Sequence, residues 1–283
     1  MKYFKDKVAV ITGAASGIGR GLTERCLAEG MHVVMADIEE KALQETAQAL
    51  RGQGANSVLA VPTDVAVKAE IEALAARTIA EFGEVHLLFN NAGIAAGPGI
   101  LGTTDADWDW VMGVNLMSVI HGLRTFLPIM IAQESEAHVV NTASVAGLLY
   151  GGGSVSYSVT KHAVVALTES SYFELAQAGS KVGMSVLCPG FIATNIMDAS
   201  RNRPARFRNE ATDANSPQMF QRQEMVRQMI AAGMAPADLA AIVFDGIRAQ
   251  RLYILTHEDF DQMILQRAQH ITEGTNPDLP FQV

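Results

Sequence analysis

The chain has 283 residues and a formal net charge of −9; 49% of its residues are hydrophobic and only 6% are aromatic. This acidic balance argues against nucleic acid or an anionic membrane as a partner, and the length allows a sizeable core. No run of about 18 uncharged apolar residues and no signal-peptide pattern occur, so we expect a cytoplasmic protein without a membrane span.

Short β-branched apolar runs alternate with longer helical patterns. The predicted strands are 8–13, 32–37, 57–64, 85–93, 138–144, 182–190 and 251–256. The predicted helices are 17–30, 39–51, 67–82 and 236–249. Because the strands are apolar throughout, both of their faces are expected to be buried, as in a parallel sheet between helices. The pattern predicts one α/β domain over residues 1–283, a doubly wound (Rossmann) seven-stranded parallel sheet with helices on both faces.

A glycine-rich link, Thr12-Gly13-Ala14-Ala15-Ser16-Gly17-Ile18-Gly19, joins the first strand to the first helix. Glycines permit a tight turn and a close backbone approach, and a helix N-terminus presents free N–H groups to an anion. Such a link is either a structural turn or a phosphate site, and its place between a strand and a helix favours the phosphate site. The expected cofactor contacts are Gly13, Ser16, Gly17, Ile18 and Gly19.

The second strand ends at Asp37, whose carboxylate can accept hydrogen bonds from the ribose of an adenine dinucleotide and repels a 2′-phosphate. Neither Ile38 nor Ser16 supplies the cation that a 2′-phosphate needs, so the sequence predicts NAD rather than NADP. Ligands of open α/β sheets bind outside the carboxyl ends of the strands. The residues there that we expect to face the adenine and its ribose are Asp64, Val65, Asn90, Asn91, Ala92 and Gly93.

Within SVSYSVTKHAVVAL, residues 154–167, Tyr157 and Lys161 are four residues apart. On a helix this spacing puts both side chains on one face, where an ammonium group stabilises a phenolate and lowers the pKa of the tyrosine. The pair is therefore either a proton-handling device or two side chains on a solvated helix face. The spacing alone leaves both interpretations open.

Residues 191–235 contain no predicted strand and break the alternation. A segment this long inside a compact domain is usually functional or mobile, so we expect a substrate-binding loop or lid. Residues 94–100 and 145–152 should complete the pocket. Met225 and Met229 share a helix face, for which two compatible interpretations exist: the packing of a lid helix on the body, and contact with a bulky, largely apolar or aromatic substrate.

Four arginines in the same segment form the only dense basic cluster: Arg201, Arg203, Arg206 and Arg208. They either attract an anionic substrate or belong to a solvated loop in which they pair with Glu210 and Asp213. Cys26 and Cys188 lie in predicted core elements and make no disulfide framework. The histidines show no ligand spacing, so no metal is expected.

Five features follow one another in a fixed order: T-G-x-x-x-G-x-G over 12–19, N-N-A-G over 90–93, Ser144, Y-x-x-x-K over 157–161 and P-G over 189–190. Together they resemble the classical short-chain dehydrogenase/reductase family through nearly the whole chain. The extended branch of that superfamily, with its epimerases and dehydratases, uses T-G-x-x-G-x-x-G, which this chain lacks. The resemblance implies a Rossmann-fold oxidoreductase that transfers a hydride between a substrate and a nicotinamide.

By this resemblance Tyr157 is the catalytic acid/base, and Ser144 holds and polarises the substrate oxygen. Lys161 lowers the pKa of Tyr157 and binds the nicotinamide ribose, while Asn115 supports a water that completes a proton relay. The implied contacts of the nicotinamide carboxamide and diphosphate are Pro189, Gly190, Ile192 and Thr194. Helices of roughly 104–132 and 154–178 are implied to build a homotetramer or homodimer.

We therefore expect an NAD-dependent enzyme acting on a small molecule, a bulky and largely apolar or aromatic secondary alcohol or its ketone. The alternative is a catalytically silent, dinucleotide-sensing regulatory member of the same fold. Such relatives are expected to lose the serine, tyrosine or lysine, and all three are present here. An epimerase or dehydratase is disfavoured by the glycine spacing and by the lack of a sizeable second domain.

Overall fold

Seven parallel strands form one sheet in the computed structural model, which describes residues 1–52, 57–97, 99–150, 154–209 and 217–277. The strands are β1 (Val8–Thr12), β2 (His32–Asp37), β3 (Val58–Pro62), β4 (Leu87–Asn90), β5 (Ala137–Thr142), β6 (Val182–Cys188) and β7 (Tyr253–Leu255). Their order across the sheet is β3-β2-β1-β4-β5-β6-β7. The predicted parallel sheet is confirmed, and each strand overlaps its predicted range.

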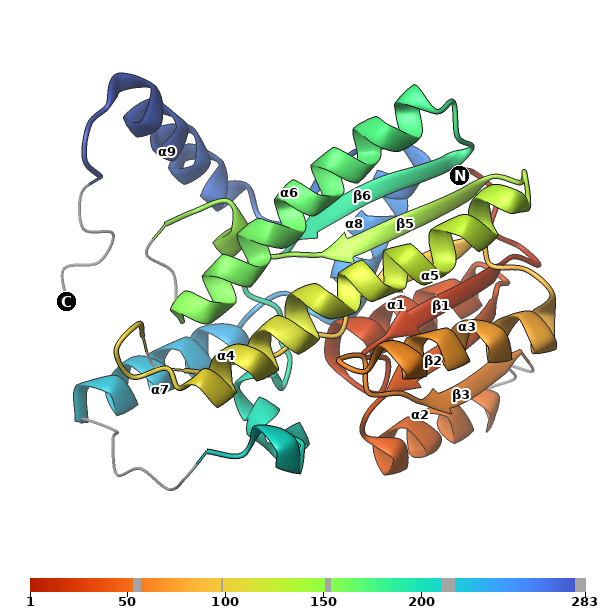
Figure 1. Cartoon of the computed structure of the whole chain (residues 1–283), viewed down its shortest axis with the longest axis horizontal. Coiled ribbons are helices and arrows are strands. Elements are labelled where there is room, and N and C mark those ends of the chain that lie inside the picture. Colours follow the sequence, from red (N-terminus) through yellow and green to blue (C-terminus); the bar gives the residue numbers. More distant parts are fainter. Residues whose placement is uncertain (53–56, 98, 151–153, 210–216, 278–283) are drawn as a thin grey trace.

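Helices cover both faces of this sheet (Figure 1). One face carries α1 (Gly17–Ala28), α2 (Glu40–Gly52) and α8 (Pro236–Arg248), and the other carries α3 (Lys68–Phe82), α5 (Ser118–Ala132) and α6 (Val155–Gln177). Neighbouring residues of β4 show why the strands lack alternation. Phe89 packs with Phe244 in the core under α8, whereas Leu88 belongs to the core under α5 and α6. The predicted doubly wound arrangement is confirmed.

One long helical segment runs along the second face. It consists of α4 (Asp105–Met112), a π-helical turn (Gly113–Met117) and α5, and it packs against α3, β4 and α6. By length and composition alone the stretch Asp105–Ala132 could cross a membrane, and 44% of its most apolar window is buried inside the protein. Its contacts are those of a core helix.

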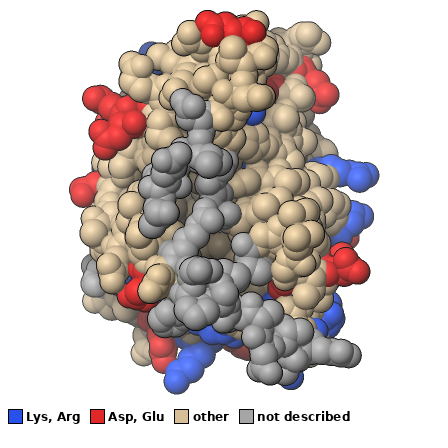
Figure 2. Space-filling view, turned by 90° about the vertical axis from the view of Figure 1, so that its left-hand side faces the viewer, with Lys and Arg blue, Asp and Glu red and all other residues tan. Residues whose placement is uncertain are grey.

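The strand order creates the crevice that positions the site. The chain moves outward from β1 to β3 and then returns to β4 on the other side of β1, so the loops that leave β1 and β4 diverge. The arrowheads of β5 and β6 mark the carboxyl end of the sheet on the left of Figure 1. Figure 2 looks onto that side, where charges of both signs lie around the rim of the described surface and neither forms a continuous patch.

Residues 189–235, the segment after β6, are partly helical where the structure describes them, and Ile192 pairs with Met234 in an isolated β-bridge. The segment contains the 3₁₀ helices Ile196–Asn202 and Ala205–Phe207 and then α7 (Pro217–Ala231). In α7 the half-buried side chains are Val226 and Ile230. Met225 and Met229 are 49% and 44% exposed, so the interpretation in which these two methionines pack the helix on the body is wrong.

The remaining helix, α9 (Asp261–Glu273), follows the 3₁₀ turn Glu258–Phe260 and extends away from the sheet (Figure 1). None of its residues is buried. The sequence analysis did not predict it, although Ile264, Ala268 and Ile271 recur at helical spacing within it.

Candidate active site

The glycine-rich turn between β1 and α1 leaves no room for a side chain at Gly17 or Gly19. A Cβ added at Gly19 would lie 2.0 Å from the carbonyl oxygen of Gly13, which itself has a φ of +68°. Gly17 has a φ of +52°, and a Cβ there would lie 3.0 Å from Cγ2 of Thr194. The first turn of α1 holds no acidic residue, and the Ser16 side chain does not cap it. The backbone N–H groups of this turn can therefore bind an anion, which the helix dipole favours.

Asp37 ends β2 beside that turn. Its Oδ2 accepts a hydrogen bond from the backbone N–H of Ala15 at 3.0 Å, and its Oδ1 accepts one from Glu39 at 3.0 Å. Burial raises the pKa of Asp37, and these backbone hydrogen bonds lower it in part. The next side chain, Ile38, is 40% exposed and apolar. The Asp37 carboxylate therefore lies at the expected ribose position, and its neighbour Ile38 supplies no cation for a 2′-phosphate.

The first asparagine of the Asn-Asn-Ala-Gly stretch is buried in the sheet. Asn90 Nδ2 donates to Asn141 Oδ1 at 2.8 Å. The amide also lies under α5, where a Cβ added at Gly122 would come within 2.2 Å of Asn90 Oδ1. The prediction that the Asn90 side chain faces the adenine is wrong, because this amide is hydrogen-bonded to Asn141 within the sheet and covered by α5.

Asn91 and Ala92 bind the end of β1. Asn91 Nδ2 donates to the carbonyl oxygen of Thr12 at 2.9 Å, and the backbone N–H groups of Asn91 and Ala92 donate to Thr12 Oγ1 at 2.9 and 3.1 Å. Asn91 Nδ2 would also lie 2.8 Å from a Cβ added at Gly19. These contacts fix the glycine-rich turn to the end of β4.

Two further predicted cofactor contacts pack into the cores. Ile18 packs against the core under α1 and α8, and Val65 is buried in the core under α3. Asp64 stands beside Val65 at the end of β3, and its Oδ1 accepts a hydrogen bond from Ala66 at 3.0 Å. Its Oδ2 makes an ion pair with Arg206 at 2.6 Å. Both oxygens of this carboxylate therefore have protein partners.

Tyr157 and Lys161 lie on α6, and Ser144 lies just after β5. Lys161 Nζ donates to the carbonyl oxygen of Thr142 at 2.8 Å and lies 5.5 Å from the centroid of the Tyr157 ring. The Ser144 side chain caps the 3₁₀ turn Val145–Gly147 by accepting a hydrogen bond from Ala146 at 3.1 Å. The structure thus brings the three predicted catalytic side chains together at the carboxyl end of the sheet.

Burial governs the protonation of this group. It raises the pKa of Tyr157, which a hydrogen bond with Ser144 lowers in part and Cys188 raises further. The expected net lowering of this pKa by Lys161 is therefore wrong for the chain by itself, because desolvation of the phenol dominates. Burial also lowers the pKa of Lys161 to about 8 and raises that of the Cys188 thiol to about 12. At neutral pH the phenol and the thiol are thus protonated.

Asn115 lies in the π-helical turn between α4 and α5 and is fully buried. Its amide makes two hydrogen bonds of 2.9 Å with the backbone of Ile94, and Nδ2 also donates to Thr160 Oγ1 at 3.2 Å. A Cβ added at Gly93 would lie 3.5 Å from Lys161 Nζ and 3.7 Å from Asn115 Oδ1. The lysine amine and the asparagine oxygen therefore approach the same point beside Gly93.

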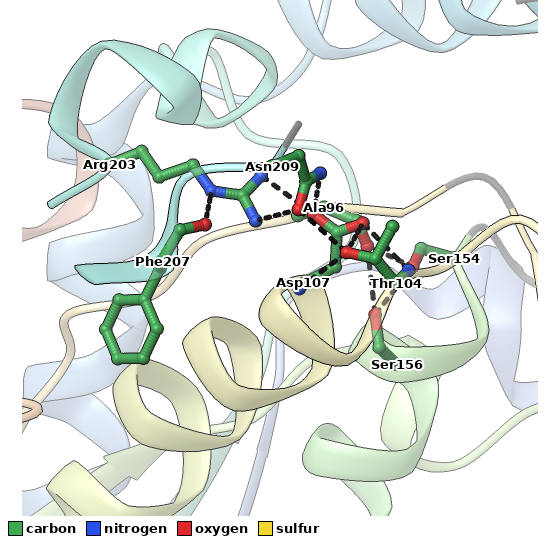
Figure 3. Close-up of polar contacts among 8 residues, drawn as sticks. All are labelled: Ala96, Thr104, Asp107, Ser154, Ser156, Arg203, Phe207 and Asn209. Atoms are coloured by element: carbon green, nitrogen blue, oxygen red, sulfur yellow. Dashed lines mark hydrogen bonds and ion pairs between the residues drawn. The ribbon is translucent and has the colours of Figure 1, made fainter. Parts of the chain in front are cut away.

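Two serines at the start of α6 fix this helix to the loop after β4. Ser154 Oγ and Ser156 Oγ donate to the carbonyl oxygen of Ala96 at 2.6 and 2.9 Å (Figure 3). These contacts hold the turn of α6 that carries Tyr157. The sequence analysis missed them because a serine pair carries no signal for a partner so distant in the chain.

The Pro189–Gly190 link after β6 is covered by the segment after β7. The Gly190 N–H donates to Thr256 Oγ1 at 3.1 Å, and a Cβ at this glycine would lie 2.7 Å from both His257 Nδ1 and Phe260 Cε2. Ile192, the next predicted contact, is a buried core residue. The sequence analysis did not find Thr256, His257 or Phe260, since no motif marks a loop that only the fold brings there.

The four arginines of the basic cluster lie in residues 196–209, which we call the strap. Three of them pair with carboxylates at the carboxyl end of the sheet or at the start of α4. The pairs are Arg201–Glu39 at 2.8 Å, Arg203–Asp107 at 2.7 Å and Arg206–Asp64 at 2.6 Å. These three arginines thus pair with carboxylates of other elements, whereas the expected pairing with Glu210 and Asp213 falls on residues outside those that the structure describes.

Arg203 holds the strap to the start of α4 (Figure 3). Its Nε donates to the carbonyl oxygen of Phe207 at 2.6 Å, and Asn209 Nδ2 donates to Asp107 Oδ1 at 3.1 Å. The side chains of Arg203 and Asp107 are only 14% and 6% exposed. Burial alone would raise the pKa of Asp107, but hydrogen bonds from Thr104, Arg203 and Asn209 hold it below its usual value. This pair is therefore a buried anchor.

Comparisons with known proteins agree with this geometry. Residues 7–205 match the family model described as short chain dehydrogenase. The chain is 37% identical to a "CLA biosynthesis dehydrogenase/reductase" of Lactiplantibacillus plantarum, over 99% of this chain and 98% of that protein. It is 32% identical to a "C alpha-dehydrogenase" of Sphingobium sp. (strain NBRC 103272 / SYK-6), over 98% and 89%.

Among solved structures, a short chain dehydrogenase/reductase from Burkholderia phymatum in complex with NAD superposes with a TM-score of 0.96. It is 44% identical, and the match covers 100% of both chains. The motif order, the parallel sheet and these similarities all agree: the chain belongs to the short-chain dehydrogenase family.

Proposed function

We propose that this protein is an NAD-dependent dehydrogenase or reductase that transfers a hydride between a secondary alcohol, or its ketone, and the nicotinamide. The observation that carries the proposal is the convergence of Ser144, Tyr157 and Lys161 at the strand ends, beside a turn suited to a diphosphate. The names of the two curated relatives and the NAD in the related crystal structure support it.

The residues present fit an adenine dinucleotide. The glycine-rich turn, with its positive φ angles at Gly13 and Gly17, and the uncapped start of α1 suit the diphosphate. Asp37 suits the adenosine ribose and opposes a 2′-phosphate. Lys161 suits the nicotinamide ribose, and the loop from Pro189 through Gly190 and Ile192 to Thr194 suits the carboxamide and the diphosphate. Asp64, Asn91, Ala92 and Gly93 would border the adenosine and its ribose.

When bound, NAD⁺ supplies the hydride acceptor, and NADH supplies the donor. Tyr157 exchanges a proton with the oxygen of the substrate, and Ser144 donates a hydrogen bond to that oxygen. Because its pKa is raised, the phenol keeps its proton at neutral pH and can donate it during ketone reduction. Alcohol oxidation needs the phenolate, so raising the pH should favour oxidation.

The proton has a route behind Tyr157. Lys161 Nζ and Asn115 Oδ1 approach one point at Gly93, so a water held between them could pass protons from the active site toward solvent. Asn115 acts by position, because its amide is fixed to the backbone of Ile94. The protonated amine of Lys161 also stabilises the phenolate of Tyr157 once it forms.

The substrate would lie against residues 94–100, 145–152 and 191–235 of a single domain that spans residues 1–283. Ile94 and Leu149 are buried there and Met197 is half-buried, which supports a bulky, largely apolar or aromatic substrate. Residues 98, 151, 152 and 210–216 of these segments lie outside the described residues.

A cytoplasmic homodimer or homotetramer completes the proposal. On α6, Val159 and Phe173 are 45% and 59% exposed although they are apolar. Such side chains support an interface between copies of this helix. Light scattering coupled to size-exclusion chromatography would test it, because Phe173→Glu should then shift the mass toward the monomer.

The test of the proposed activity is NADH formation with a panel of bulky secondary alcohols. Wild type should form NADH at 340 nm, and Tyr157→Phe should lose at least about 10²-fold in kcat, since it removes the group that exchanges the proton. Fluorescence titration should show that this variant still binds NADH. Tyr172→Phe, on the same helix and away from Ser144, is the matched control and should keep its activity.

If wild type and Tyr157→Phe are equally inert across the panel while both bind NAD, the proposal fails and the dinucleotide-sensing regulator is favoured. Equal activity of the two proteins would instead remove Tyr157 from the chemistry.

A further inference from the structure

The strap crosses the adenosine side of the proposed cofactor site. Arg201 reaches Glu39, which lies two positions after the end of β2, and Arg206 reaches Asp64 after β3. These are the two strand ends that border the adenosine. The strap belongs to residues 191–235, which are expected to bind the substrate. This segment therefore also contacts the strand ends that border the adenosine.

Glu39 connects the strap directly to the ribose-binding carboxylate. Its backbone N–H donates to Asp37 Oδ1 at 3.0 Å. Its side chain accepts hydrogen bonds from Arg201 Nη2 at 2.8 Å, from Arg201 Nε at 3.2 Å and from Asn202 Nδ2 at 2.9 Å. The Arg201 guanidinium is thus linked to Asp37 through Glu39, whose two carboxylate oxygens accept its hydrogen bonds and neutralise its charge.

Arg201 does not depend on Glu39 alone for its position. Its Nη1 donates to the carbonyl oxygens of Asn195 and Asp198 at 3.2 and 3.0 Å, both within the arginine's own segment. The anchor Arg203–Asp107 holds the following residues of the strap on α4. Removing the charge of Glu39 should therefore leave the guanidinium in place with its charge uncompensated.

An uncompensated guanidinium at this position has an obvious ligand class. Arg binds phosphate through parallel N–H donors, and a phosphate on the 2′-oxygen of the adenosine ribose would project toward Asp37 and its neighbours. Ser16 and Ile38, the two positions at which the sequence could supply such a cation, carry no charge. The structure shows that a cation reaches the same edge from residue 201.

We propose that Arg201 and Glu39 form a second determinant of coenzyme preference, in which Arg201 is a latent 2′-phosphate site that Glu39 masks. The proposal rests on the proposed NAD site. Preference for NAD then has two parts, repulsion of the 2′-phosphate by Asp37 and occupation of Arg201 by Glu39. Changing Asp37 alone removes the repulsion and leaves the cation masked.

The test is isothermal titration with 5′-AMP and 2′,5′-ADP, which differ only in the 2′-phosphate and require no turnover. Wild type should bind 5′-AMP in preference to 2′,5′-ADP. In the Asp37→Ala background, adding Glu39→Gln should raise the affinity for 2′,5′-ADP by about tenfold or more and change that for 5′-AMP by less than about threefold. Adding Arg201→Gln to this double variant should abolish the gain.

Glu45→Gln is the matched control, because Glu45 lies on α2, the helix that begins directly after Glu39, with a side chain 67% exposed, and its substitution changes the net charge equally. It should leave both affinities unchanged. Glu39→Ala should reproduce the gain of Glu39→Gln, which guards against an effect of one particular substitution. Melting temperatures verify that each variant is folded.

Three results would overturn the proposal: no gain on removing Glu39, a gain that persists without Arg201, or an equal gain in the Glu45→Gln control. The titrations also separate this inference from the proposed reaction. An enzyme inert toward alcohols that still shows the Arg201-dependent gain would reject the reaction and keep the inference. A wild type that binds neither nucleotide would reject both.

Discussion

Lys161 is a buried cation whose charge should destabilise the fold at neutral pH. Burial lowers the pKa of Lys161 from 10.5 to about 8, with Cys188 acting in the opposite direction. This difference of roughly 2.5 pH units corresponds to roughly 3 kcal/mol at about 1.4 kcal/mol per unit. Lys161→Met removes the buried charge and should therefore stabilise the fold at pH 7 by up to roughly 3 kcal/mol, even though it removes a proposed catalytic group and the hydrogen bond to the carbonyl of Thr142.

The pH dependence gives the sharper test. Below about pH 8 the lysine is charged in both the folded and unfolded states, so the penalty is constant. Between about pH 8 and 10.5 the unfolded chain binds the extra proton, so this lysine's contribution to stability rises with pH. Wild type should therefore gain roughly 3 kcal/mol relative to Lys161→Met across that window, measured by urea unfolding at several pH values. A pH-independent difference between the two proteins would refute the reasoning.

Three other substitutions test separate parts of the site. Asp37→Ala should weaken NADH binding by about tenfold and narrow the preference over NADPH, measured by fluorescence titration; unchanged affinities would remove this carboxylate from the ribose site. Gly19→Ala places a Cβ 2.0 Å from a carbonyl and should lower the melting temperature and abolish NADH binding, whereas Gly52→Ala meets nothing within 4 Å and should do neither. Arg203→Leu leaves the buried Asp107 carboxylate without its cation and should destabilise the fold by about 3 kcal/mol, measured by urea unfolding; a cost below about 1 kcal/mol would contradict its role as an anchor.

Local patterns determined much of the architecture. Strands buried on both faces and linked by helices identify a parallel sheet, because only helices on each side can cover continuous apolar strands. The glycine-rich turn could be predicted from the sequence, because a helix whose start lies against another part of the backbone needs glycine at the points of contact. The pairing of Tyr157 with Lys161 could be predicted because a spacing of four residues is about one helical turn, which depends only on the local sequence.

Other features depended on segments that meet only in the folded chain. The arginines of the strap could be recognised as a basic cluster, but their partners Glu39, Asp64 and Asp107 lie on other elements, far away in the sequence. The side chain of Asn90 lost its expected role because α5 and Asn141 surround its amide.

The protonation of Tyr157 shows the division most clearly. The sequence places a cation four residues from the phenol and so indicates a lowered pKa, whereas the folded chain buries the phenol and raises it. Sequence spacing determines which groups are neighbours along a helix and therefore which chemistry is available. Desolvation and ion pairing depend on everything packed around a group, so only the tertiary structure decides the charge it carries and the partner it meets.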